Sequence, residues 1–312
     1  VKYATVKLGS LQDLNFGEDS VVIIDNRLLY TVPSVKYPLY KTYDGGKSWN
    51  PISGFFKSSI IDMYFLDNSV GFIVTRYEGV FKTIDGGDSW TRILGAEILF
   101  VEANGQSTSI ANSVPEKISF YDSDNGIVTM TYGPSGRLHL STKNGGQNWD
   151  YNYLPFKLNK IIFPEKSNKG GYAVTSSNSI VKTDDGANTW SSVFEDFLGT
   201  ISFVDVNKWL CLNRGKLYET FDGGITYCEI RDTIYKNADQ FLSNDINNIL
   251  SLHNEYCLVY YEKLVIISQN DYKIISTIDT HDLYFSELYC PDINTIYGST
   301  NTGRIYKYVF EE

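Results

Sequence analysis

The chain has 312 residues, a formal net charge of −10 and a pI near 4.9. An acidic chain repels phosphate backbones and anionic membranes, so this balance argues against a nucleic-acid-binding protein. Its 24 Tyr and 17 Phe favour β-strands, and the length is enough for one large β domain. The apolar runs are too short to cross a bilayer, so we expect no membrane span.

The start of the chain carries no pattern typical of a signal peptide. It begins with Val1 rather than Met, which is what removal of a leader would leave. A secreted, periplasmic or cell-surface protein is therefore expected, with a cytoplasmic protein as the alternative.

Short predicted strands, separated by turns, recur along the chain in groups of four strands. The second group shows this best: strands at Ile60–Asp67, Gly71–Arg76 and Val80–Thr83 precede a glycine-containing turn, and a fourth strand follows. Each group therefore predicts a four-stranded antiparallel sheet. Seven groups can be placed, at residues 11–54, 58–94, 116–154, 158–194, 199–232, 244–279 and 282–310.

The seventh group has only three strands, whereas Tyr3–Leu8 at the other end of the chain belongs to no group. Pairing this segment with the last group would close the array into a ring, which leaves no sheet edge exposed to aggregation. We therefore predict an all-β fold, a single seven-bladed β-propeller over residues 1–312. Its blades are four-stranded and antiparallel, and residues 2–8 complete the last one. We expect a monomer.

A short motif recurs five times, as KTYDGGKSW, KTIDGGDSW, STKNGGQNW, KTDDGANTW and ETFDGGITY. Its copies lie 41, 59, 41 and 37 residues apart, which is the spacing of a blade-sized repeat. The acidic or amide position is occupied by Asp44, Asp85, Asn144, Asp185 and Asp222. The aromatic position is occupied by Trp49, Trp90, Trp149, Trp190 and Tyr227.

The motif is typical of a tight hairpin turn. Glycine adopts positive φ without a Cβ penalty, and the Asp carboxylate accepts hydrogen bonds from the backbone ahead of it. The Ser or Thr that follows can bond back across the turn, and the aromatic residue is expected to pack between neighbouring repeats. We therefore interpret these aspartates as folding devices rather than as catalytic groups.

The four cysteines are Cys211, Cys228, Cys257 and Cys290, and none stands in a CxxC or Cys/His spacing. We therefore expect no metal and no cofactor. Free thiols buried in strands and two disulfides both remain open for these residues.

The sequence resembles the Asp-box, or BNR-repeat, β-propellers of the sialidase-like superfamily. The KTxDGGxSW rhythm looks most like the photosystem II stability/assembly factor-like proteins. The resemblance covers nearly the whole chain and implies the propeller fold. It implies several functions, because the same repeats occur in sialidases, xyloglucanases, sortilin-type receptors and assembly factors.

A sialidase-like enzyme would need an arginine trio, a Tyr/Glu nucleophile pair and a Phe/Tyr-Arg-Ile-Pro signature near the start. The sequence has no such signature, since the nearest string, TRIL at Thr91–Leu94, directly follows Trp90 and belongs to an outer strand. The three histidines, His139, His253 and His281, form no Ser/His/Asp spacing. These absences favour a binding protein over an enzyme.

A xyloglucanase-like or other two-carboxylate glycosidase needs two acids that face each other across about 5 to 10 Å. Asp62, Asp245 and Asp282 stand at comparable places, where the first strand of a repeat begins. Their side chains could face the mouth of the propeller, so they are candidates for that site. The other interpretation is a set of solvated acids at strand starts.

Cationic residues recur at the turn between the second and third strands of a repeat. Propeller topology puts this turn on the rim opposite the aspartate turns, so these cations would gather on one face. Such a face would suit carboxylates, sulfates or an acidic protein surface. Charged residues are also common in exposed turns that bind nothing. The cations are Arg27, Arg76, Arg137, Arg214, Lys263 and Arg304.

The sequence therefore favours a non-catalytic binding or assembly propeller that recognises a protein or an anionic glycan through this rim. The alternative is a glycoside hydrolase of sialidase-like or xyloglucanase-like type, with carboxylates at the central mouth. A long insertion at Gly95–Pro115 is either a lid or docking loop over that mouth or a tolerated excursion.

Overall fold

A computed structural model describes residues 5–7, 14–17, 20–24, 39–42, 50–52, 56–58, 60–67, 69–95, 100–103, 106–109, 113–131, 137–164, 169–230, 246–251, 255–260, 263–279, 285–292, 295–300 and 304–309. The regular elements in these ranges are all β-strands, so the fold is all-β as predicted. None of the described segments forms a helix that could cross a membrane.

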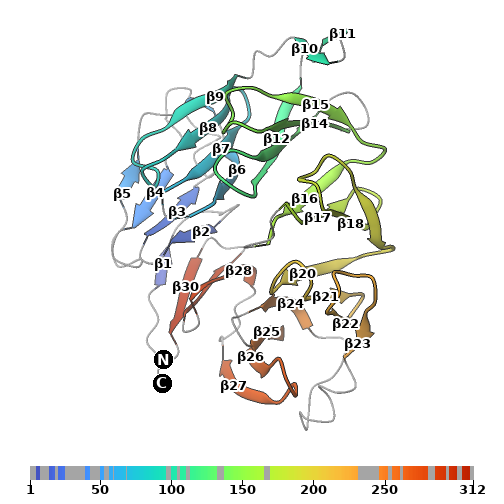
Figure 1. Ribbon diagram of the computed structural model, residues 1–312. Helices are drawn as coiled ribbons and strands as arrows, with labels where there is room; N and C mark the ends of the chain where they lie inside the picture. Colours follow the sequence, from blue (N-terminus) through green and yellow to red (C-terminus); the bar gives the residue numbers. More distant parts are fainter. Residues whose placement is uncertain are drawn as a thin grey trace.

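The described strands form seven four-stranded antiparallel sheets and one two-stranded hairpin, and Figure 1 shows the sheets side by side around a ring. The inner strands are β2 (Leu14–Gly17), β6 (Ile60–Phe65), β12 (Val114–Phe120), β16 (Leu158–Ile162), β20 (Gly199–Phe203), β24 (Ile246–Ser251) and β28 (Phe285–Asp292). The second strands are β3 (Ser20–Ile24), β7 (Gly71–Thr75), β13 (Gly126–Thr131), β17 (Gly171–Thr175), β21 (Trp209–Asn213), β25 (Glu255–Tyr260) and β29 (Thr295–Thr300). The third strands are β4 (Leu39–Thr42), β8 (Gly79–Thr83), β14 (Leu138–Thr142), β18 (Ile180–Thr183), β22 (Lys216–Thr220), β26 (Lys263–Ser268) and β30 (Arg304–Val309). The outer strands are β5 (Asn50–Ile52), β9 (Thr91–Gly95), β15 (Asp150–Tyr153), β19 (Ser191–Phe194), β23 (Cys228–Glu229), β27 (Ile274–Asp279) and β1 (Thr5–Lys7).

The inner strands of most neighbouring sheets contact one another. Contacts join β2 with β6, β6 with β12, β12 with β16, β20 with β24, β24 with β28, and β28 with β2. Both ends of the chain contribute to one sheet, because β1 pairs antiparallel with β30 and places Val6 opposite Ile305. The first and last sheets are therefore neighbours.

Aromatic side chains fill the space between adjacent sheets. Phe72 of β7 stacks on Phe120 of β12 with the ring centroids 3.7 Å apart, and both side chains are fully buried. Gly126 opens β13 at a point where a Cβ atom would lie 2.4 Å from the Phe120 ring. A glycine is needed there because any side chain would displace the ring. Apolar contacts of this kind join the β6–β9 sheet to the β12–β15 sheet.

The glycine-containing turns between third and fourth strands have the hydrogen bonds that their sequence predicts. In the β8–β9 turn, Asp85 accepts hydrogen bonds from the Thr83 hydroxyl (2.7 Å), the Ser89 amide (2.9 Å) and the Ser89 hydroxyl (2.6 Å). The Gly87 amide donates to Thr83 Oγ1 at 2.8 Å, and Gly87 has a φ of 94°. We call this arrangement the turn motif. It recurs around Asn144, Asp185 and Asp222, and Asp44 and Trp49 lie outside the described residues.

The aromatic residue of the motif packs toward the preceding sheet, as the sequence predicts. The Trp149 indole N–H lies 3.1 Å from Gly146 O and 3.4 Å from Ile93 O, which belongs to β9 of the preceding sheet. Tyr227 packs on Phe194 of β19 with ring centroids 4.8 Å apart. The motif therefore closes a hairpin and joins two sheets.

Antiparallel pairing gives the ring two different faces. The turn motifs lie on one face with the turns between first and second strands, since the Gly86 amide donates to Ser69 O at 2.8 Å. We call this the turn face. The turns between second and third strands lie at the opposite strand ends, beside the connections between sheets, since the Arg214 amide donates to Leu198 O at 3.1 Å. We call this the arginine face.

The described hairpin of the insertion after β9 does not cover the centre of the ring. It contains the hairpin β10 (Phe100–Ala103) and β11 (Gln106–Ser109), and β10 contacts the outer strand β15. In Figure 1 this hairpin projects from the periphery. The interpretation as a lid over the mouth is therefore wrong for the described hairpin. The physical reason is that the insertion leaves from an outer strand and packs on another outer strand.

Cys211 and Cys228 are free thiols. Cys211 and Cys257 are buried and Cys228 is exposed, whereas the Cys290 side chain lies outside the described part of the chain. Burial raises the pKa of the Cys211 thiol to about 12, so this group is not a reactive thiolate.

Candidate functional site

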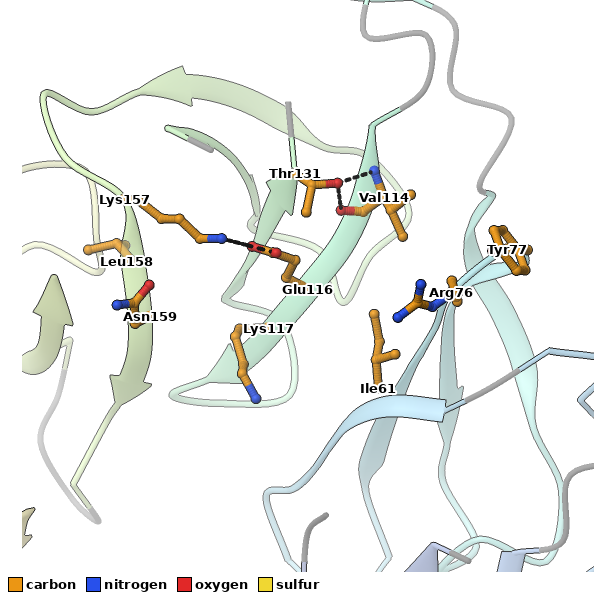
Figure 2. Close-up of a pocket in the computed structure, with 10 residues that line it drawn as sticks. All are labelled: Ile61, Arg76, Tyr77, Val114, Glu116, Lys117, Thr131, Lys157, Leu158 and Asn159. Carbon is orange, nitrogen blue, oxygen red and sulfur yellow. Dashed lines mark hydrogen bonds and ion pairs between the residues drawn. The ribbon is translucent and has the colours of Figure 1, made fainter. Parts of the chain in front are cut away.

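A cavity of 540 Å³ lies on the arginine face, where three neighbouring sheets meet. Its walls come from the starts of the inner strands β6, β12 and β16, from the end of β13 and from the turn after β7 (Figure 2). This volume is within the range of pockets that hold a small molecule or a few side chains of a peptide. The lining residues are Ile61, Arg76, Tyr77, Val114, Glu116, Lys117, Thr131, Lys157, Leu158 and Asn159.

β-Bulges position three of these side chains. In each of the strands β6, β12 and β16, the pairing register with the next strand shifts by one residue near the strand start. A bulge inserts one residue into a strand and changes the direction of its side chain. The inserted residues all line the cavity, and they are Ile61 in β6, Glu116 in β12 and Asn159 in β16.

Three cations and one carboxylate line the cavity. Lys157 Nζ lies 2.7 Å from Glu116 Oε2, and Lys117 Nζ lies 3.2 Å from Asp62 Oδ1. Figure 2 shows the Lys157 side chain extending to Glu116 and the Arg76 side chain directed into the space beside β12. Arg76 is exposed, and within the described ranges no acidic side chain forms an ion pair with it. Arg76 is therefore positioned to bind an external carboxylate.

Asp62 stabilises the contact between two sheets. Its Oδ2 accepts a hydrogen bond from the Ile118 amide of β12 at 2.7 Å, while its Oδ1 faces Lys117. Burial raises the pKa of Asp62, and the charge of Lys117 and the Ile118 amide oppose that rise. Both carboxylate oxygens are thus engaged by β12, and Asp62 does not line the cavity.

Three other predicted cations lie at the predicted turns between second and third strands, but they do not line the cavity. Arg137, Arg214 and Lys263 are exposed on the arginine face, and Arg214 pairs with Asp196 at 3.0 Å. The structure therefore brings Arg76 together with lysines that the sequence pattern did not single out. Arg304 begins β30 but its side chain is outside the described part, as are Arg27, Asp245 and Asp282 altogether.

Sequence reasoning missed Lys117 and Lys157, which complete the cationic lining. A cue was present for the bulges and for Lys117, because the inner strands VPEKISF and LNKII each carry adjacent polar residues within an otherwise apolar segment. Lys157 directly precedes the second of these strands and has no such cue. Such a polar pair indicates a bulge or a change of face, and a bulge at a ring opening points a side chain into the opening.

The lining limits the chemistry that the cavity supports. Glu116 is the acid among the lining residues, and it is paired with Lys157, so the described cavity offers no second carboxylate for a two-acid glycosidase. Within the described ranges, no three His, Cys, Asp or Glu side chains gather as a metal site. The arrangement fits reversible binding of an anion with apolar contacts from Ile61, Tyr77 and Leu158.

Comparisons with known proteins agree with this architecture. The sequence matches the family described as photosynthesis system II assembly factor YCF48 over residues 41–208, which is more than half of the chain. No curated protein matches the sequence. A solved structure described as YCF48 bound to D1 peptide has a TM-score of 0.67 and 16% identity, and the match covers 99% of this chain and 97% of that one.

Two other solved structures extend the comparison. The β-propeller domain of Cps50 (Swd1) from Myceliophteria thermophila has a TM-score of 0.64 and 9% identity, with 99% of each chain covered. A GH74 enzyme from Niastella koreensis has a TM-score of 0.58 and 12% identity, covering 93% of this chain but 50% of the enzyme. At such identities these matches concern the fold alone.

The ring of four-stranded antiparallel sheets and the structural matches define a β-propeller of the BNR type. The sequence match is more specific than the fold. The chain belongs to the photosynthesis system II assembly factor YCF48 family.

Proposed function

We propose that this protein is a non-catalytic assembly propeller that binds a segment of a partner protein in the arginine-face cavity. The observation that carries this proposal is the Arg76 guanidinium, which forms no ion pair with a described acid and lines the same cavity as Lys117 and Lys157, together with apolar side chains. A carboxylate of the partner would bind Arg76, and its neighbouring side chains would pack on Tyr77 and Leu158.

Membership of the family supports a peptide as the ligand. A YCF48 protein has been solved with a bound D1 peptide, so a member of this family takes a peptide ligand. The fold of the present chain matches that structure over nearly the full length of both chains. We therefore favour a protein partner over an anionic glycan, for which the cationic lining is the only support.

The proposal includes a rigid, closed scaffold. We infer seven blades in one domain, because the described residues form seven four-stranded sheets and β28 contacts β2. Closure by the β1–β30 pair would keep the inner strands at fixed positions and so preserve the cavity without a ligand. A monomer is the expected working form.

A charge-reversal experiment tests the proposal. The probe is an eight-residue peptide with two glutamates and a C-terminal carboxylate, and its control replaces both glutamates by glutamine and amidates the end. We expect Arg76→Glu to weaken binding of the acidic peptide at least about ten-fold, since it replaces an attraction by a repulsion. Arg92→Glu is the matched control, because Arg92 is an exposed residue of the outer strand β9.

Equal affinity of the wild type and the Arg76→Glu variant for the acidic peptide would refute the binding site. A glycan array and a panel of chromogenic glycosides, measured on the same preparation, address the other two functions. Binding of a sulfated or uronic-acid glycan that depends on Arg76 would indicate that the ligand of this site is a glycan rather than a protein. Hydrolysis of a glycoside would contradict the proposed non-catalytic function and indicate an enzyme.

A further inference from the structure

At two positions of the turn motif, the side chain takes no part in the hydrogen bonds that all four described motifs share. One immediately precedes the Asp or Asn, the other follows the second glycine position, and the side chains at both are exposed in all four described motifs. At the first position the other motifs carry Ile84, Lys143 and Asp184, and at the second they carry Asp88, Gln147 and Asn188. The motif between β22 and β23 carries apolar residues at both, Phe221 and Ile225.

Packing does not explain the apolar residues Phe221 and Ile225 at the two variable positions of this turn. Phe221 is 60% exposed and Ile225 is 79% exposed. Tyr227 takes the place of the motif tryptophan and is 47% exposed, whereas Trp90 at the same position is buried. Single exposed apolar residues are common, but three on one turn form a patch of the kind that marks interaction surfaces. We call Phe221, Ile225 and Tyr227 the apolar turn.

Carboxylates from two sheets surround the apolar turn. Burial raises the pKa of the Tyr172 hydroxyl to about 12, and the negative charges of Asp184, Asp205 and Asp222 add to that rise. The Tyr172 hydroxyl lies 2.6 Å from Val206 O, in the turn between β20 and β21, and 3.2 Å from Gly223 O, in the apolar turn's own hairpin. The Gly223 amide donates to Asn207 O at 2.8 Å, so the β20–β21 turn packs on the apolar turn. Asp222 belongs to this hairpin, and Asp205 accepts a hydrogen bond from the Asn207 amide in the turn packed on it. Asp184 pairs with Lys182, whose Nζ would lie 3.1 Å from a Cβ atom on Gly223.

The lysines near the apolar turn form ion pairs or hydrogen bonds within the protein. Lys208 Nζ lies 5.3 Å from the centroid of the Phe221 ring, 2.8 Å from Gln269 Oε1 and 3.9 Å from Glu219 Oε1. Lys182 pairs with Asp184 at 3.1 Å, which leaves the Asp184 side chain 75% exposed. The surface around the apolar turn is thus apolar at its centre and acidic at its edge.

We propose that the apolar turn is a second docking surface, which binds a protein segment that carries an apolar side chain flanked by lysine or arginine. Charge complementarity selects this occupant, because a cationic flank would face Asp184, Asp205 and Asp222 while the apolar side chain packs on Phe221 and Ile225. The surface lies on the turn face, opposite the cavity. The propeller would then hold two partner segments at once, one acidic and one basic.

The chain itself supplies replacements that keep the turn motif intact. Lys143 and Gln147 occupy the two positions in the motif between β14 and β15, so Phe221→Lys with Ile225→Gln retains every hydrogen bond of the turn. Ile84→Lys is the matched control, since it makes the same change in the motif between β8 and β9. Asp184→Asn is a milder variant that removes one charge from the acidic edge.

The probe is a fluorescent peptide with the core Leu-Trp-Leu between two pairs of lysines, titrated by anisotropy against the full chain. We expect the Phe221→Lys/Ile225→Gln variant to bind it about ten-fold more weakly, Asp184→Asn about two-fold more weakly, and Ile84→Lys as the wild type does. A peptide with glutamates in place of lysines should bind at least about ten-fold more weakly to the wild type.

Three results would overturn this proposal. They are unchanged binding by the double variant, an equal loss with Ile84→Lys, and equal binding of the glutamate peptide. Sedimentation of the protein alone adds a fourth, because a dimer that the double variant abolishes would assign the surface to a second copy of this chain. Arg76→Glu should leave this binding unchanged, so failure here is distinguishable from failure of the arginine-face cavity.

Discussion

Replacing Asp85 by alanine should destabilise the protein through one turn motif. Asp85 accepts three hydrogen bonds, from the Thr83 hydroxyl and from the amide and hydroxyl of Ser89, at 2.6 to 2.9 Å. Alanine removes both acceptor oxygens, and with them all three hydrogen bonds, and leaves the glycine turn without the group that fixes it. Asparagine is the graded comparison, since Asn144 occupies the same position in another motif and accepts from the Thr142 hydroxyl and the Asn148 amide.

The size of the effect follows from the number of bonds lost. A hydrogen bond in an exposed turn contributes on the order of 0.5 to 1 kcal/mol, so Asp85→Ala should cost about 2 kcal/mol. Asp85→Asn keeps one acceptor oxygen and loses the bond from the Ser89 hydroxyl, so it should cost about 1 kcal/mol or less. For a chain of this size 2 kcal/mol corresponds to a decrease in Tm of about 4 °C.

Thermal unfolding followed by circular dichroism at several pH values checks both the size and the cause. Hydrogen bonds from Ser89 lower the pKa of Asp85 to about 2, from an ordinary value of 3.8. Because the folded pKa is the lower one, the stabilisation is fully present above about pH 4 and is lost as the pH falls through 2. The difference in Tm between wild type and Asp85→Ala should therefore shrink below pH 4. Equal Tm values for the alanine and asparagine variants, or a difference that grows in acid, would refute this reasoning.

Two further predictions concern the core. Gly126→Ala should lower the free energy of unfolding by about 2 kcal/mol, because the added Cβ would lie 2.4 Å from the Phe120 ring. Urea unfolding measures this loss. The double variant Gly126→Ala/Phe120→Leu should recover part of it. Burial lowers the pKa of His139 to about 4, although the backbone carbonyl of Ala187 opposes this shift. The unfolded chain therefore binds a proton near pH 6.5 that the folded chain does not bind, so stability should fall by up to about 3 kcal/mol between pH 6.5 and 4. His139→Leu should remove that part of the pH dependence in chemical unfolding measured across this range, and an unchanged slope would contradict the assignment.

Local chemistry made the turns and strands predictable. Glycine at positive φ, a carboxylate acceptor and a following hydroxyl act within nine residues, so the bonds around Asp85 follow from the sequence once the strands are placed. The recurrence of this motif at blade-sized intervals also predicts repeated sheets, because each repeat must bury its apolar faces against its neighbours. The position of Trp149 between two sheets is one such consequence.

The cavity was less predictable, because its lining depends on the register of three separate strands. The pattern of turn cations placed Arg76 on the face that carries the cavity, but it gave Arg137 and Arg214 the same weight, and these do not line the cavity. Asp62 was predicted as a candidate for the mouth, whereas its carboxylate binds the Ile118 amide of the neighbouring sheet. A contact between residues 56 positions apart has no signature in the local sequence.

The amino-acid sequence thus specified the all-β class, the repeat and the chemistry of each turn, since these depend on residues that are neighbours along the chain. The arrangement in space decided which side chains share a surface. Bulges that shift the register by one residue point Glu116 and Asn159 into the cavity, and the packing of one sheet on the next places Tyr172 against the turn that carries Phe221 and Ile225. Register and packing between sheets are properties of the folded ring, and for that reason both proposed surfaces emerge only from the structure.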